Sequence, residues 1–331
     1  MQTQVRAATR ATRKAIAPRF QGSAIKRVLV PIDFSRISLK AIPYALAISR
    51  RFGADVHLLH VVDTTQFLSP ALLSLAATAR AEWNQRVMAR LQRLASRYKA
   101  DGTVHVLQPS EGRAYNEICT VAQELNADLI VVATHGYTGY RRAFLGSTAE
   151  RVVQHSPCPV LIVRPDAHDR AGFNGRRSPT DFRPARILVP TDFSECAKRG
   201  FRYAVKLARE FKAELRLVHV INPHAYPFGD EYAALDAAQL ISQASHIARK
   251  RMRDMGAKTK ARYSVKIEHG SPARKICEAA NQDTDLIVIS THGRTGLRHV
   301  LIGSTAERVV RYARCPVLIL PTRFKSRFNK D

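Results

Sequence analysis

The chain has 331 residues, a mass of 37.0 kDa and a formal net charge of +26. One domain usually spans about 100–200 residues, so this length predicts two domains. The hydrophobic share of 45% is typical of a globular protein, and no apolar run reaches the roughly 18 residues of a membrane span. We therefore expect a globular protein with no membrane partner, whose charge attracts polyanions without sequence preference.

The chain begins with a basic segment. Residues 1–24 contain Arg and Lys but no Asp or Glu, which predicts a disordered basic arm. An Arg-rich, acid-free start also fits a transit peptide, and the arm is the preferred interpretation.

The first domain is expected over residues 25–165, where short apolar runs alternate with amphipathic ones. Ser35 is a candidate N-cap for the first helix, and Gly53 is expected to end it. The expected strands are 27–32, 55–62, 104–107, 129–133 and 160–163, and the expected helices are 35–52, 70–98, 115–125 and 147–155.

The second half of the chain repeats the same order of sequence segments. VLVPIDFS at 28–35 becomes ILVPTDFS at 187–194, and segments 135–163 and 292–320 share GSTAERVV and CPVLI in the same order, as expected of a duplicated unit. A Gly- and Pro-containing linker over 166–184 precedes a second domain over 185–322 and a basic tail over 323–331. The expected second-half strands are 187–189, 215–220, 264–268, 286–290 and 317–320, and the helices are 195–211, 232–255, 274–280 and 304–312.

Short, wholly apolar strands alternating with helices predict parallel strands buried on both faces. We expect two doubly wound, five-stranded α/β domains of Rossmann-like type. In such sheets a ligand binds outside the carboxyl ends of the strands. The residues at those ends are Pro31, Ile32 and Asp33 with their repeats Pro190, Thr191 and Asp192, and the helix openings Gly146-Ser147-Thr148 and Gly303-Ser304-Thr305.

A helix N-terminus that opens with Gly-Ser-Thr is a candidate phosphate site, because its free N–H groups and helix dipole attract anions. By itself the tripeptide more often caps a helix, but its repetition after a Gly-rich loop favours phosphate binding. Asp33 and Asp192 either bind ribose, base or a phosphate-bound Mg²⁺, or cap the following helix, and both interpretations stay open.

Other polar residues are expected to be structural. His135 and His292 lack a nearby carboxylate in sequence, so we prefer backbone hydrogen bonding over catalysis. His60, His219 and Trp83 are expected to pack in the core, and Cys158 and Cys315 to be buried thiols. The five cysteines form no C-x-x-C pair, and their odd number in a chain of this size indicates reduced thiols and a cytoplasmic protein.

These repeats resemble the universal stress protein family over both halves. The nucleotide-binding branch carries G-x₂-G-x₉-G-[ST]; Gly136 with Gly146-Ser147 and Gly293 with Gly303-Ser304 match its later positions, while Ala133 and Ser290 replace the first glycine. The resemblance implies that Asp33 and Asp192 lie near the ribose and base, that the Val61 and Val220 backbones contact adenine, and that Val132 and Ile289 line the base. It also implies that the Gly-Ser-Thr segments hold phosphates, and that the last strands of the two halves pair as a pseudo-dimer.

Arg294 follows Gly293, whereas Tyr137 stands at that place in the first half, so the two sites are expected to differ in affinity. The expected function is nucleotide-gated regulation in a stress response, with ATP or another adenine nucleotide, optionally with Mg²⁺, and an unidentified protein partner. The alternatives are a basic nucleic-acid-associated protein and a slow ATP hydrolase, and a homodimer of the whole chain also stays open.

Overall fold

A computed structural model describes residues 25–63, 70–98, 103–134, 146–164, 182–222, 233–281, 283–291, 303–322 and 324. The expected arm over 1–24, most of the linker and most of the tail lie outside these residues. So do the loops 135–145 and 292–302.

The first half contains the expected alternation of strands and helices. Its strands are β1 (Arg27–Pro31), β2 (Asp55–Leu59), β3 (Val61–Val62), β4 (Val104–Val106), β5 (Ser110–Glu111), β6 (Leu129–Ala133) and β7 (Val160–Val163). Its helices are a short 3₁₀ turn, η1 (Ser38–Lys40), and α2 (Ala41–Phe52), α3 (Pro70–Ser96), α4 (Ala114–Glu124) and α5 (Ser147–His155).

The second half repeats this order. Its strands are β8 (Arg186–Pro190), β9 (Glu214–Ile221), β10 (Tyr263–His269), β11 (Leu286–Ser290) and β12 (Val317–Leu320). Its helices are α7 (Glu195–Phe211), α8 (Ala233–Ala257), α9 (Pro272–Ala280) and α10 (Ser304–Tyr312).

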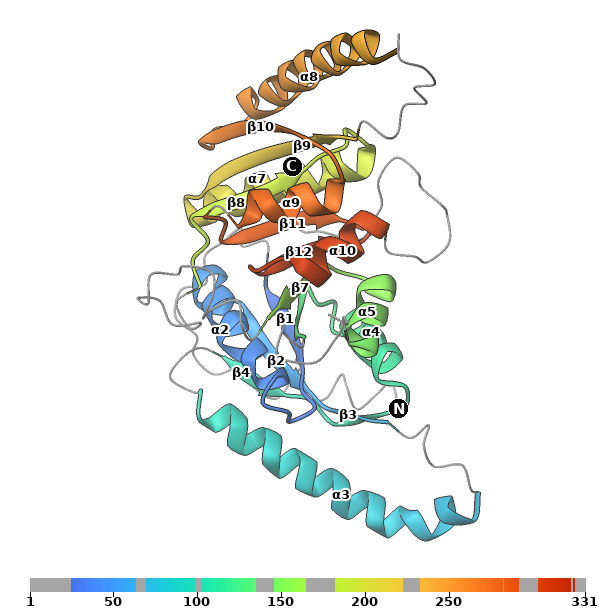
Figure 1. The fold of residues 1–331 in the computed structure, drawn as a ribbon. Helices are drawn as coiled ribbons and strands as arrows, with labels where there is room; N and C mark the ends of the chain where they lie inside the picture. Colours follow the sequence, from blue (N-terminus) through green and yellow to red (C-terminus); the bar gives the residue numbers. More distant parts are fainter. Residues whose placement is uncertain are drawn as a thin grey trace.

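The two halves form one continuous sheet of ten strands, in the order β10-β9-β8-β11-β12-β7-β6-β1-β2-β4 (Figure 1). Each half contributes five parallel strands, and only the central pair, β7 with β12, is antiparallel, with Leu161 opposite Leu318. The predicted fold class and the pseudo-dimer within one chain are confirmed. β3 and β5 form a separate two-stranded extension in the first half.

Helices cover both faces of this sheet. One buried cluster joins α2, α3, α7 and α8 to one face, and a second cluster joins α4, α5, α9 and α10 to the other. Val28 and Val30 of β1 belong to the first cluster and Leu29 to the second, as strand alternation requires. The inner strands are therefore largely apolar, because neither of their faces meets water, whereas the edge strand β10 carries exposed polar residues.

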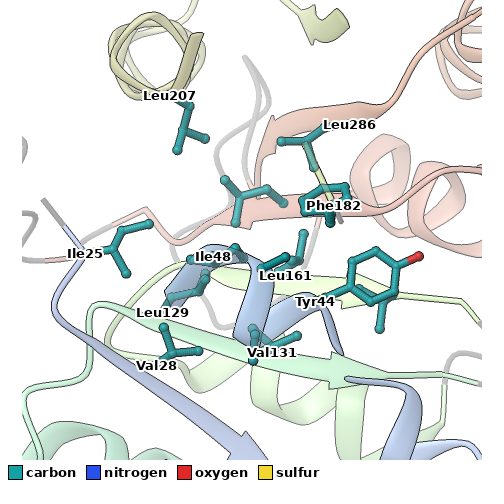
Figure 2. Packing of buried hydrophobic residues seen from close by; sticks show 14 of the residues in the cluster. Ile25, Val28, Tyr44, Ile48, Leu129, Val131, Leu161, Phe182, Leu207 and Leu286 are labelled. Atoms are coloured by element: carbon teal, nitrogen blue, oxygen red, sulfur yellow. The ribbon is translucent and has the colours of Figure 1, made fainter. Parts of the chain in front are cut away.

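The first cluster is continuous across the junction between the halves. Leu129 and Leu161 of the first half and Leu286 of the second belong to this one cluster, and Figure 2 shows Phe182 beside Tyr44. The Phe182 and Tyr44 ring centroids are 5.0 Å apart, and Phe324 packs in the same manner on Tyr203, the repeat of Tyr44. Phe182, which was expected in the linker, and Phe324, which was expected in the tail, thus cover the core beside α2 and α7.

Three expectations for the elements need correction. The first helix begins at Ala41 and not at Ser35, because Ser35 Oγ accepts from the Ser38 N–H and starts the 3₁₀ turn instead. The expected strand 55–62 is interrupted at His60. Trp83 does not pack in the core, since it lies on the outward side of α3 with 53% of its surface exposed.

Candidate nucleotide site

The strand order reverses at β1 and β6 in the first half and at β8 and β11 in the second. We call the region just past the carboxyl ends of these strands the crevice of each half, because ligands bind there in such sheets. Ile32 and Thr191 follow β1 and β8 and are buried, and each carbonyl accepts a hydrogen bond from a histidine Nδ1, 2.7 Å from His60 and from His219 respectively. A carbonyl can only accept, so Nδ1 carries the proton in both histidines. The expectation that these histidines are satisfied is confirmed, although both are half-buried and not in the core.

Asp33 and Asp192 form the same local turn. The Oδ1 atom of Asp33 accepts from the Ser35 N–H at 2.8 Å, and that of Asp192 accepts from the Ser194 N–H at 3.0 Å. Partial burial would raise the pKa of Asp33, but hydrogen bonds from Ser35 and Ser38 outweigh it and lower that pKa below its ordinary value. Asp33 is exposed, so an ionised carboxylate stands at the mouth of the crevice.

Neither aspartate is itself the N-cap. In the second half Ser194 is the N-cap of α7, and its Oγ accepts from the Ala197 N–H at 3.1 Å. The aspartates instead shape the turn that carries the chain from the strand into the helix.

The helices opening with Gly-Ser-Thr begin without a side-chain cap. The N-caps are Gly146 for α5 and Gly303 for α10, and a glycine has no side chain with which to cap the first turn. Ser147 and Ser304 are the first helical residues, followed by Thr148 and Thr305. The hydroxyls of Ser147, Thr148, Ser304 and Thr305 thus lie one or two residues after the N-cap position, at a helix start whose first N–H groups and dipole suit an anion.

Gly146 is not explained by packing or by backbone strain. A Cβ atom there would meet nothing within 4 Å, and its φ of −54° suits any residue. In the second half, the Gly303 N–H donates to the Thr291 carbonyl at 2.7 Å, which brings the start of α10 against the end of β11. The helix start and the strand end thus form one edge of the crevice.

The backbones of Val61 and Val220 face the crevice. The carbonyl of Leu59 accepts from Ile32, and that of Val218 accepts from Thr191, so each faces the neighbouring strand β1 or β8. Successive carbonyls of a strand point to opposite edges, so the carbonyls two residues on, in Val61 and Val220, point to the same side. The neighbouring strands end at Pro31, opposite Leu59, and at Pro190, opposite Val218. The carbonyls of Val61 and Val220 therefore have no strand beside them on the side toward the crevice.

The two small residues at the position of the motif's first glycine lie at strand ends, Ala133 at the end of β6 and Ser290 at the end of β11. The Ser290 hydroxyl points to α7, where it donates to the Cys196 carbonyl at 2.7 Å. Val132 and Ile289 are 7% and 8% exposed, in the cluster that underlies the crevice. The predicted Gly136, Gly293 and Arg294, together with His135 and His292, lie outside the described residues.

The sequence analysis missed one feature of this edge. In both halves, a phenylalanine that directly follows the aspartate lies against the histidine and under an arginine of the outer helix. The repeated Asp-Phe-Ser could have drawn attention to the phenylalanines, but the arginines lie far along the chain in helices of dissimilar sequence.

Other predicted structural residues behave as expected. Cys158 and Cys315 are buried, and burial raises the pKa of each thiol to about 12, so neither is a nucleophile near neutral pH. In the part of the chain that the structure describes, no group of three or more His, Cys, Asp or Glu residues could hold a metal ion. Within the same residues, every helix is too short or too polar to cross a membrane.

The fold and these two crevices define a tandem Rossmann-like α/β protein. The universal stress protein family model matches residues 24–164 and 185–321. The chain therefore belongs to the universal stress protein family.

Among its relatives, a universal stress protein of Methanocaldococcus jannaschii is 37% identical over 142 residues, covering 42% of this chain and 82% of the relative. A universal stress protein of Mycolicibacterium smegmatis is 26% identical over 302 residues, which is 89% of this chain and 97% of the relative. The crystal structure of a universal stress protein from Archaeoglobus fulgidus superimposes with a TM-score of 0.61 at 24% identity, covering 89% of this chain and 96% of that one. This last likeness supports the fold.

Proposed function

We propose that each half binds an adenine nucleotide in the crevice at the carboxyl ends of its strands, and that occupancy serves regulation and not turnover. The observation that carries this proposal is a helix start whose N-cap is a glycine without a capping side chain, repeated at Gly146 and Gly303. The N–H groups and the dipole of such a helix start suit phosphate oxygens. The resemblance to the nucleotide-binding branch supports the same assignment.

The other parts of the crevice fit a nucleoside. The carbonyls of Val61 and Val220 are directed to the side where β1 and β8 have ended, and a carbonyl there can accept from the exocyclic amine of adenine. Asp33 and Asp192 stand beside them as acceptors for ribose hydroxyls. A Mg²⁺ ion bound to the phosphates would compensate the charge of these carboxylates.

The proposal is tested by placing a negative charge at the helix start. Asp is among the best N-cap residues, so Gly146→Asp and Gly303→Asp should preserve or strengthen the helices while repelling phosphate. Gly146→Asn and Gly303→Asn are matched controls that cap without charge. Binding is measured by mass spectrometry of the released ligand and by a thermal titration with ATP, with and without Mg²⁺.

We expect about two nucleotides per wild-type chain, one for either single Asp variant and none for the double Asp variant. Ligand at about 100 times its Kd adds roughly 2.7 kcal/mol to stability, which is readily detected. Unchanged ATP binding by the double Asp variant would contradict the proposed site. Substituting Asp33 and Asp192 by Asn separates turnover from binding, since a hydrolase would lose the first while keeping the second.

Polyanion binding is a second candidate, favoured by the charge of the outer helices. Arg93 lies exposed on α3 and Arg97 directly after it, and Lys258 and Lys260 lie exposed just after the end of α8. Such contacts release counterions from nucleic acid, so affinity would fall steeply with salt. Binding to duplex DNA that stays constant between 50 and 200 mM salt, or is absent at both, would refute this candidate.

A further inference from the structure

In both halves three side chains form a column beside the crevice. The Arg90 guanidinium of α3 lies 4.2 Å from the Phe34 ring centroid, and that ring lies 4.8 Å from the His60 ring. We call Arg90, Phe34 and His60 the first column.

The second half repeats the column at the equivalent positions. The Arg251 guanidinium of α8 lies 4.6 Å from the Phe193 ring centroid, which is 4.7 Å from the His219 ring. We call Arg251, Phe193 and His219 the second column. The outer helices have dissimilar sequences, so the same stack in both points to a shared role and not to a chance surface contact.

The phenylalanine of each column adopts an unfavourable backbone conformation. Phe34 has a φ of 63° and Phe193 a φ of 65°, a region that bulky residues rarely occupy. This conformation turns the chain so that the preceding aspartate accepts from the serine two residues later. The arginine and the histidine that contact the ring hold this turn, and with it the carboxylate at the crevice.

The histidine connects the column to the proposed base-binding strand. His60 donates to the Ile32 carbonyl at the end of β1 and directly precedes Val61. His219 donates to the Thr191 carbonyl and directly precedes Val220. One stack therefore contacts the strand on each side of the crevice.

The arginine belongs to the outer helix, and a second residue of that helix makes a hydrogen bond to the same half of the protein. Asn84 of α3 donates to Glu111 Oε1 at 3.2 Å, and Ser245 of α8 lies 3.1 Å from His269 Nε2. In each helix the arginine is six residues after this second contact. Over residues 81–96 of α3, Val87, Leu91, Leu94 and Ala95 are buried, and most of the other side chains are exposed. Figure 1 shows α3 and α8 at opposite ends of the sheet.

We propose that Arg90 and Arg251 are positioning residues that couple nucleotide occupancy of each crevice to its outer helix. This inference rests on the proposed function, because it needs nucleotide in the crevice. A nucleotide that fixes the aspartate turn also fixes the phenylalanine ring, the ring fixes the arginine, and the arginine holds the helix. Linkage requires the reverse as well, so loss of the arginine weakens nucleotide binding.

The test compares two double variants of the full chain. Arg90→Ala with Arg251→Ala removes the cation from both columns. Arg86→Ala with Arg253→Ala removes the same charge from the same two helices at exposed positions outside the columns. ATP binding is measured by calorimetry, and amide hydrogen exchange is followed in α3 and α8 with and without ATP.

We expect the column variant to bind ATP about two- to fivefold more weakly than the control, the change that a cation–π contact at an exposed site supports. ATP should slow exchange in α3 and α8 of the wild type and the control but not of the column variant. Phe34→Leu with Phe193→Leu keeps apolar volume while removing the rings, and should reproduce the loss.

Equal affinity and equal helix protection in the column and control variants would overturn the coupling while leaving the proposed function intact. A wild type that binds no ATP would overturn both proposals. ATP binding by all variants without any protection of α3 or α8 would also overturn the coupling.

Discussion

Gly200 and Ser290 form a contact pair whose energy can be measured directly. A Cβ atom on Gly200 of α7 would lie 2.8 Å from Ser290 Oγ, the atom that donates to the Cys196 carbonyl. Gly200→Ala gains about 1 kcal/mol in helix propensity. Crowding, or rotation of the hydroxyl with loss of its hydrogen bond, costs roughly 1–3 kcal/mol. We expect a net destabilisation of about 1 kcal/mol.

The double variant supplies the decisive comparison. Ser290→Ala alone loses one hydrogen bond and about 1 kcal/mol. Adding it to Gly200→Ala removes the crowding and recreates the pair that the first half has, Ala41 with Ala133. The double variant should therefore unfold within about 0.5 kcal/mol of the wild type in urea, which gives a favourable coupling of about 2 kcal/mol.

The first half provides a mirror control for this pair. Ala133→Ser introduces the hydroxyl opposite the methyl group of Ala41, and it should be destabilising by a similar amount. Strict additivity of Gly200→Ala and Ser290→Ala would refute the contact.

Three further predictions concern other sites. Burial lowers the pKa of His57 to about 4, helped by the neighbouring His105 and Arg27 and opposed by Asp55, so the unfolded chain binds the proton first as pH falls. The free energy of unfolding should therefore drop by about 3 kcal/mol between pH 6.5 and 4. His57→Leu should flatten that decline in denaturation curves. Lys212 ends α7 with a φ of 55°, where α2 has Gly53, so Lys212→Gly should raise the urea midpoint by the equivalent of about 0.5–1 kcal/mol, and a lower midpoint would contradict this. Arg164 donates to the last carbonyls of α10 across the junction, so Arg164→Ala should cost roughly 2 kcal/mol by the same assay, and no loss would show that the contact is dispensable.

The sequence predicted the fold because its strands are apolar on both faces and because the pattern occurs twice. Each expected strand has a counterpart, and Gly53 ends α2 with a φ of 64° as expected. The pairing of the last strands followed from the family resemblance and is confirmed, and the structure shows that it is antiparallel. Hydrophobic periodicity alone could not predict this pairing, because it identifies strands but does not show which edge strands pair with each other.

The misses have local causes. Ser35 looks like an N-cap, but the competing turn at Ser38 delays the helix to Ala41. The outward position of Trp83 depends on which side of a long amphipathic helix meets the sheet, and α3 buries only a narrow face. The direction of the Ser290 hydroxyl depends on the missing side chain of Gly200, a contact between distant segments that no local pattern encodes.

The antiparallel pairing of β7 with β12 determines how this chain can associate. Both strands have a neighbour on each side, so a second copy cannot extend the sheet there, and only β4 and β10 remain as edges. Because one polypeptide carries both partners of the junction, dilution cannot separate them, and one gene always supplies them in equal number. Symmetry between the partners is then no longer required, so the two crevices can evolve different affinities while sharing one scaffold. The two halves already differ in their packing, since Ala41 and Ala133 of the first half correspond to Gly200 and Ser290 of the second.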